Sequence, residues 1–84
     1  MTELFGINVR GPDDIVATRD YPEAVALAQR LNTAFAQHVA TKHHEYDPLI
    51  WAIPGVWLGT VESHAANLLD PGDDYREAVA AVRA

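Results

Sequence analysis

The side chains best suited to metal chemistry gather in one short segment of this 84-residue chain: His38, His43, His44, Glu45 and Asp47. Imidazole and carboxylate groups are ligands that zinc and nickel favour. Their spacing matches no closed structural site, and the neighbours His43 and His44 would point apart on a regular helix or strand. His38 also continues an apolar stripe, which favours a position bordering the core. We therefore predict no metal and no other cofactor, with a metal site in this segment as the open alternative.

Nucleophilic catalysis has few candidates, because the chain contains no cysteine. Ser63 and His64 are neighbours in the sequence, and adjacent residues do not form a serine–base pair in regular structure. Gly55 and Gly59 lack the lysine and the surrounding pattern of a phosphate-binding loop. Paired carboxylates remain, and they lie where turns and helix starts explain them. The sequence predicts that the protein is not an enzyme.

Acidic residues carry the clearest pattern. Four of them fall within one short stretch relieved only by Arg76, and two more form a second acidic tip; these are Asp70, Asp73, Asp74 and Glu77, and then Asp13 and Asp14. Acids near a helix N-terminus are stabilised by the helix dipole, but capping needs only one or two of them. Two interpretations stay open: the acids bind a partner, or they form a solvated face that keeps a small domain in solution.

The overall charge favours some partners over others. Twelve acidic against six basic residues give a net charge of −6. That balance repels a phosphate backbone, so we expect no direct binding of DNA or RNA. The same field attracts a basic protein surface. The expected partner is a protein or ribonucleoprotein with such a surface.

Composition and length limit the architecture to a single domain covering residues 1–84. The absence of cysteine excludes disulfides and suits a reducing cytoplasm. The first residues lack the basic stretch and long apolar run of a secretion signal. The longest apolar run, residues 49–54, is too short to span a bilayer. We expect a soluble, cytoplasmic protein without membrane contact, and the sequence does not indicate its oligomeric state.

The first half of the chain predicts a hairpin followed by a long helix. Residues 4–9 and 15–18 have strand patterns, joined by a turn at residues 10–14. Asp20 and Glu23 form a capping-box pattern with Pro22 in the first turn. From there to about residue 41, apolar residues recur at helical spacing, which predicts one long amphipathic helix.

The second half predicts further short elements. Residues 42–48 form a loop, and residues 49–53 form a strand that we expect to be buried on both faces, with Trp51 in the core. Pro54 and Gly55 turn the chain, and residues 56–58 add a short edge strand. Trp57 has two interpretations, a core residue or an exposed anchor for a partner.

Two short helices complete the chain. The first spans residues 60–69, with Thr60 or Ser63 as its cap and one apolar face made of Val61, Ala65, Leu68 and Leu69. The second starts with a capping box from Asp74 to Glu77 and turns Tyr75, Val79 and Val82 inward. The element order is ββαβ(β)αα, with sheet order 2-1-3. The fold class is α+β: a small antiparallel or mixed sheet of three to four strands, packed by the long helix.

Three segments of the sequence resemble small accessory proteins of phages and prophages: residues 5–14, the alanine-rich helix, and residues 57–65, which end Glu62-Ser63-His64-Ala65. Among such proteins, anti-CRISPR inhibitors are similar in size, in acidity and in the lack of a cofactor. The resemblance implies stoichiometric binding to a CRISPR effector, often at its basic DNA-binding surface. It carries over no functional residue, because anti-CRISPR proteins share no common motif.

These observations predict a non-enzymatic inhibitor that binds a basic, nucleic-acid-binding surface of a host defence complex through an acidic face. The alternative is a phage accessory or regulatory protein that binds a host or virion protein through an apolar patch around Trp57.

Overall fold

The computed structural model describes residues 3–42 and 50–84 of the chain. The predicted loop falls mostly outside this part, as do the candidate metal ligands His43, His44, Glu45 and Asp47. The side chain of His38 also lies outside it.

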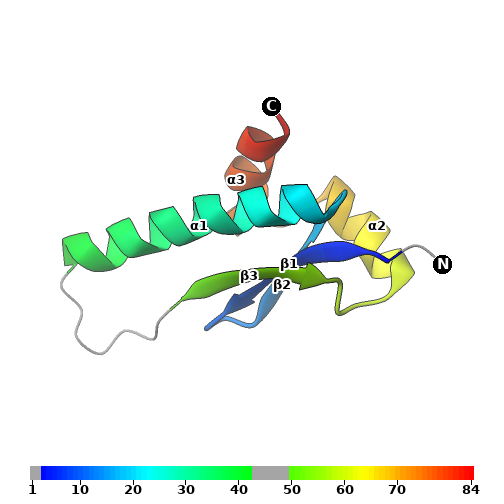
Figure 1. Ribbon diagram of the computed structural model, residues 1–84, viewed down its shortest axis with the longest axis horizontal. Coiled ribbons are helices and arrows are strands. Elements are labelled where there is room, and N and C mark those ends of the chain that lie inside the picture. Colours follow the sequence, from blue (N-terminus) through cyan, green and yellow to red (C-terminus); the bar gives the residue numbers. More distant parts are fainter. Residues whose placement is uncertain (1–2, 43–49) are drawn as a thin grey trace.

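The fold is α+β, as the sequence predicts, with three strands and three helices in the described residues: β1 (Phe5–Arg10), β2 (Asp14–Thr18), α1 (Tyr21–Lys42), β3 (Trp51–Val56), α2 (Val61–Leu69) and α3 (Asp73–Arg83). The strands form one antiparallel sheet in the predicted order β2-β1-β3. The long helix α1 lies across one face of this sheet, and α2 lies at one end of it (Figure 1).

The predicted hairpin and the start of α1 are both confirmed. A turn at residues 11–13 joins β1 to β2, with Gly11 and Asp13 at positive φ. At the start of α1, the Asp20 carboxylate accepts the amide of Glu23 at 2.8 Å. Glu23 departs from a capping box, because its carboxylate accepts the amide of Arg19, at 3.1 Å, one residue before the cap. The helix therefore begins where predicted, with a different return bond.

The main core lies between the sheet and α1. Its buried residues come from all three strands, from α1 and from α3: Ile7, Val9, Val16, Ala52, Ala24, Leu27, Ala28, Leu31, Tyr75 and Val79. The helical spacing of the α1 residues in the sequence follows from this burial, since positions three and four apart share one face. Tyr75, Val79 and Val82 of α3 face inward, as predicted.

The prediction for the third strand was wrong. β1 is central, and β3 is an edge strand whose Trp51 and Ile53 side chains are 48% and 39% exposed. Pro54 and Gly55 do not turn the chain but pair with β1, and the described residues contain no fourth strand. An unbroken apolar run is compatible with burial on two faces and equally with a strand that keeps one apolar face open.

Both edges of the sheet have side-chain partners on their main chain. Asn32 of α1 accepts the Ala52 amide at 2.7 Å and donates to the Ala52 carbonyl at 3.0 Å. These two main-chain groups of Ala52 point away from β1, toward the free edge of the sheet. Pro54 lies two residues further on and directs its main chain to the same edge, but it has no N–H to donate. On β2, the amide of Ala17 donates to Asn67 of α2 at 2.7 Å. These contacts block the addition of another strand at these positions.

The two short helices form where predicted, with different details. Thr60 caps α2 by accepting the Ser63 amide at 3.0 Å. The predicted apolar face is not the buried one, because Val61 and Leu69 are exposed. The buried residue of α2 is His64, whose Nε2 lies 3.0 and 3.1 Å from two carbonyl oxygens of the sheet. The amphipathic pattern alone does not distinguish an apolar face turned inward from one left exposed.

The last helix starts one residue before the predicted capping box. Gly72, at φ 95°, occupies the N-cap position of α3, and no side chain caps the helix. Asp73 and Asp74 lie in the first turn, where the helix dipole favours a negative charge.

Candidate protein-binding surface

Two acids of the predicted cluster share one cation. Arg76 of α3 binds the carboxylates of Asp70 and Asp73, at 2.8 and 2.6 Å. A hydrogen bond from Arg76 lowers the pKa of Asp70, and the same two acids raise the pKa of Arg76. All three side chains are largely exposed, so each pair contributes little to stability. One of the two negative charges is nevertheless compensated by Arg76 at the surface.

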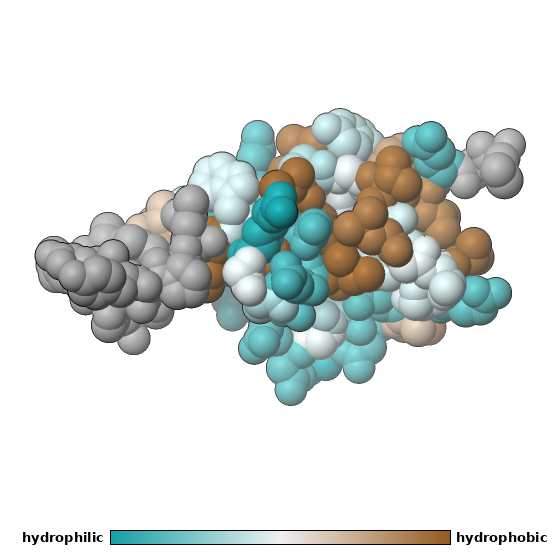
Figure 2. All heavy atoms as spheres, turned by 90° about the horizontal axis from the view of Figure 1, so that it is seen from below, coloured by the Kyte–Doolittle hydropathy of each residue, from teal (hydrophilic) through white to brown (hydrophobic). Residues whose placement is uncertain are grey.

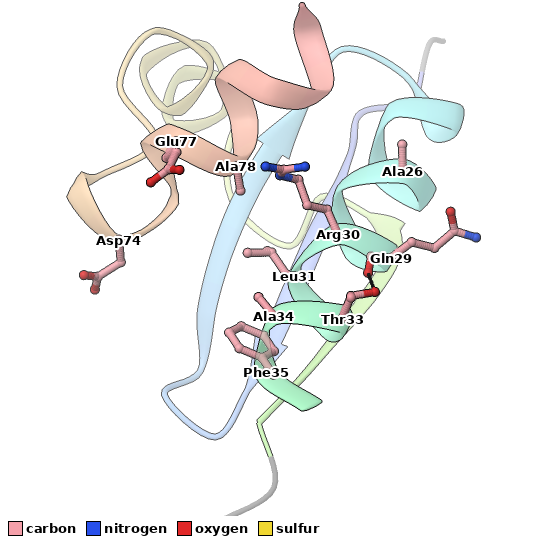
Figure 3. Close-up of a pocket in the computed structure, with 10 residues that line it drawn as sticks. All are labelled: Ala26, Gln29, Arg30, Leu31, Thr33, Ala34, Phe35, Asp74, Glu77 and Ala78. Atoms are coloured by element: carbon pink, nitrogen blue, oxygen red, sulfur yellow. Dashed lines mark hydrogen bonds between the residues drawn. The ribbon is translucent and has the colours of Figure 1, made fainter. Parts of the chain in front are cut away.

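Asp74 and Glu77 are the exposed acids of α3 without such a partner among the cations whose side chains the structure describes. They lie along one side of a groove of about 720 Å³ between α1 and α3, and Arg30 of α1 lies on the other side (Figure 3). The apolar part of the groove is made of Leu31, Ala34, Phe35 and Ala78. The two carboxylates are therefore available to a positively charged partner.

The hairpin and α3 bring their acids together, although the sequence placed them in separate clusters. The Tyr75 hydroxyl donates a hydrogen bond to the Asp14 carboxylate. Burial, together with this acceptor, raises the pKa of Tyr75, so the phenol stays protonated. Asp14, Asp73 and Asp74 line a common hollow of about 290 Å³. We define the acidic face as Asp14, Asp73, Asp74 and Glu77.

The remaining predicted acids lie at its margins. Asp13 is exposed on the hairpin turn, at φ 59°, next to Asp14. Asp70 is exposed at the end of α2, where its carboxylate also accepts the amide of Gly72 at 3.2 Å. In residues 3–42 and 50–84, the structure forms no group of three or more histidines and carboxylates that could hold a metal ion.

Trp57 is not an exposed anchor. Its side chain is only 8% exposed, and its Nε1 donates to the Thr60 carbonyl at 2.9 Å. The ring meets the His64 ring edge to face, with centroids 5.3 Å apart. Of the two interpretations of Trp57, the structure agrees with the core residue, because the segment between Gly55 and Gly59 folds back over the sheet. A glycine at position 6 permits this, since an added Cβ would lie 3.0 Å from the ring and 2.5 Å from the Val16 oxygen.

A second surface lies on the side of the sheet opposite α1, and sequence analysis did not identify it. Paired residues share a face, so this side carries residues from all three strands: Asn8, Arg10, Ile15, Trp51, Ile53 and Gly55. We call these residues the open sheet face. Viewed from this side, apolar side chains gather over part of the surface, with polar ones beside them (Figure 2). Leu58, which follows β3, also lines the hollow beside Ile53 and is 70% exposed.

A buried carboxylate on the α1 side has a structural role. Glu23 binds Arg19 at 2.6 Å and Arg83 at 3.1 Å, which joins the start of α1 to the end of α3. Burial alone raises the pKa of Glu23, but the hydrogen bonds from the two arginines outweigh it and leave the pKa below its ordinary value. This cluster has its partners inside the fold and does not form a binding site.

The chain was compared with protein families, with curated proteins and with solved structures. No protein-family model, no curated protein and no solved structure matches this chain. No helix in the described part of the chain has both the length and the apolar character that a membrane span requires.

Proposed function

We propose that this protein is a non-enzymatic inhibitor of the anti-CRISPR kind. Its acidic face would bind a basic, nucleic-acid-binding surface of a host defence complex in the cytoplasm of the host cell. The observation that carries the proposal is the hydrogen bond from Tyr75 to Asp14, which joins acids of β2 and α3 into one surface.

Electrostatics supports this kind of partner. The chain has a net charge of −6, and the acidic face concentrates part of that charge on one side of α3. A surface that binds a phosphate backbone presents lysine and arginine, which carboxylates also attract. Complementary charge raises the rate of association and excludes partners of like charge.

We expect the acids to contribute unequally to binding. Asp70 and Asp73 already bind Arg76, so a partner's cation would have to compete with that arginine. Asp74 and Glu77 require no such exchange. We expect them to contribute more to binding than Asp70 and Asp73 do.

The test uses purified CRISPR effector ribonucleoproteins and measures both binding and competition with target DNA at several salt concentrations. Wild-type protein should bind at least one effector, block its DNA binding, and lose affinity as salt rises. The Asp74→Asn/Glu77→Gln variant should weaken binding by at least about tenfold.

A matched control is available in Glu3→Gln/Glu62→Gln. Both residues are exposed, and the control removes two negative charges, as the test variant does, but away from the acidic face. Equal weakening by both variants would show that only the net charge matters. Failure to bind any effector of the panel at low salt would overturn the proposal.

A second candidate function is an accessory or regulatory phage protein that binds a host or virion protein through an apolar surface. The apolar part of the open sheet face favours it, with Trp57 as a buried support rather than the contact itself. Binding that resists salt, but is lost in Leu58→Ser, would support this candidate. Trp57→Ala is unsuitable as a probe, because Trp57 is buried and hydrogen-bonded.

A further inference from the structure

A hollow in the open sheet face is formed by two glycines that lie side by side. The sheet register pairs Gly6 of β1 with Gly55 of β3. Trp57 covers Gly6 so closely that an added Cβ would lie 3.0 Å from its ring. A Cβ added at Gly55 would meet no atom within 4 Å. The space at Gly55 is therefore open, although the packing around Gly6 is closed.

The walls of this hollow are mostly apolar. It has a volume of about 310 Å³ and is lined by residues that include Ile15, Ile53 and Leu58, while Asn8 and Arg10 add a polar part. Ile53 and Leu58 are both more than a third exposed. Since a water molecule occupies roughly 30 Å³ in the liquid, the hollow has room for a large side chain. An apolar side chain entering it would remove its own surface and that of the walls from water.

The neighbouring strand edge does not accept a strand. Asn32 occupies the outward main-chain groups of Ala52, and Pro54 offers no N–H. A partner at this face therefore makes contact through side chains rather than through main-chain pairing.

The hollow adjoins the acidic face at one residue, Ile15. Ile15 lines the apolar hollow and also the hollow that contains Asp14, Asp73 and Asp74. A partner that covers Ile15 thus meets apolar walls on one side and carboxylates on the other. An apolar centre beside a charged rim is the usual arrangement of protein interfaces.

We propose that the hollow above Gly55 receives an apolar side chain that projects from the basic surface of the partner protein. The inference rests on the proposed function for the basic character of that partner. A second copy of this chain is disfavoured as the occupant, because it carries the same net charge of −6 and would be repelled.

The test uses three short synthetic peptides and follows the backbone amide signals of the protein by NMR. The first is rich in lysine and arginine with one central leucine, the second has glycine in place of that leucine, and the third has glutamates in place of the basic residues. The leucine-containing basic peptide should bind most tightly and should shift the signals of Ile15, Ile53 and Gly55.

The variant Gly55→Val places a branched side chain in the hollow, and its Cβ meets no atom within 4 Å. It should weaken binding of the leucine peptide by about tenfold and leave binding of the glycine peptide unchanged. Its thermal stability should not fall, because valine favours strands more than glycine does. Ala36→Val, an apolar addition at an exposed position of α1, is the control and should change neither affinity.

The outcomes separate this inference from the proposed function. If Asp74→Asn/Glu77→Gln weakens both basic peptides but Gly55→Val weakens neither, the acidic face binds and the hollow does not. Equal affinity of the leucine and glycine peptides for wild-type protein, or no binding of either, would also overturn the inference. Concentration-dependent shifts of the same signals without peptide would assign the face to a second copy instead.

Discussion

The two sides of the sheet carry similar residues in different surroundings. On the α1 side, Ile7, Val9 and Val16 are covered by the long helix and are fully buried. On the opposite side, Trp57 covers Gly6, and Ile53 and Trp51 remain partly exposed. An apolar side chain on a strand thus indicates a surface that can be buried, and another element decides whether it is. The uncovered side is where a partner can supply the missing cover.

The largest expected contrast is between two leucines. Leu27 of α1 is 1% exposed in the core, and Leu58 is 70% exposed beside the open sheet face. Leu27→Ala should lower the free energy of unfolding by about 3 kcal/mol, because it leaves a cavity. Leu58→Ala should change it by less than about 0.5 kcal/mol. Urea denaturation of both variants measures this, and a large loss in Leu58→Ala would mean that the open side belongs to the core.

Removing a buried charge on the α1 side should have a smaller effect. Glu23→Gln leaves Arg83 without its carboxylate and should cost about 2 kcal/mol of unfolding free energy. The pKa of Glu23 lies below the ordinary 4.5 in the folded state. The ionised carboxylate therefore adds to the free energy of unfolding above that pH. The contribution is lost as the pH falls through the lowered pKa.

Urea denaturation at neutral and acidic pH measures this contribution. The difference in stability between wild type and Glu23→Gln should shrink on acidification. Arg19→Ala serves as a comparison. Because Arg19 is mostly exposed, its loss should lower the free energy of unfolding by less than Glu23→Gln does. A difference that is independent of pH would show that the charge of Glu23 does not stabilise the fold.

The smallest expected difference lies within the open side itself. Gly6→Ala should cost about 1.5 kcal/mol, since its Cβ would press on the Val16 oxygen and the Trp57 ring. Gly55→Ala should be neutral within about 0.5 kcal/mol, because its Cβ meets nothing. Thermal unfolding of the pair measures this. Equal losses would show that the space above Gly55 is closed in solution.

The parts of the fold that follow from local spacing were predicted from the sequence. The turn residues after β1 predicted the hairpin, and the periodic alanines and leucines predicted α1. The sheet order followed from placing the third strand beside the first. Asp20 marked the start of the helix because its side chain bonds the backbone three residues on, a strictly local interaction.

The features that depend on distant contacts were not predictable in this way. The burial of His64 depends on carbonyl groups from both strands of the hairpin, far away in the sequence. The contact of Asp14 with Tyr75 joins residues 61 positions apart, so the acids looked like two clusters. Trp57 could be placed only with the knowledge that Gly6 lies beneath it.

The hydrogen bonds of Asn32 protect the edge of β3 only at a late stage of folding. The Asn32 side chain forms hydrogen bonds with the outward N–H and C=O groups of Ala52. Because Asn32 belongs to α1, these bonds form only after the helix has docked on the sheet. Until then, β3 presents an apolar sequence with its outer main-chain groups unpaired. The risk of aggregation is therefore concentrated in newly synthesised or transiently opened chains, and it decreases once α1 is in place.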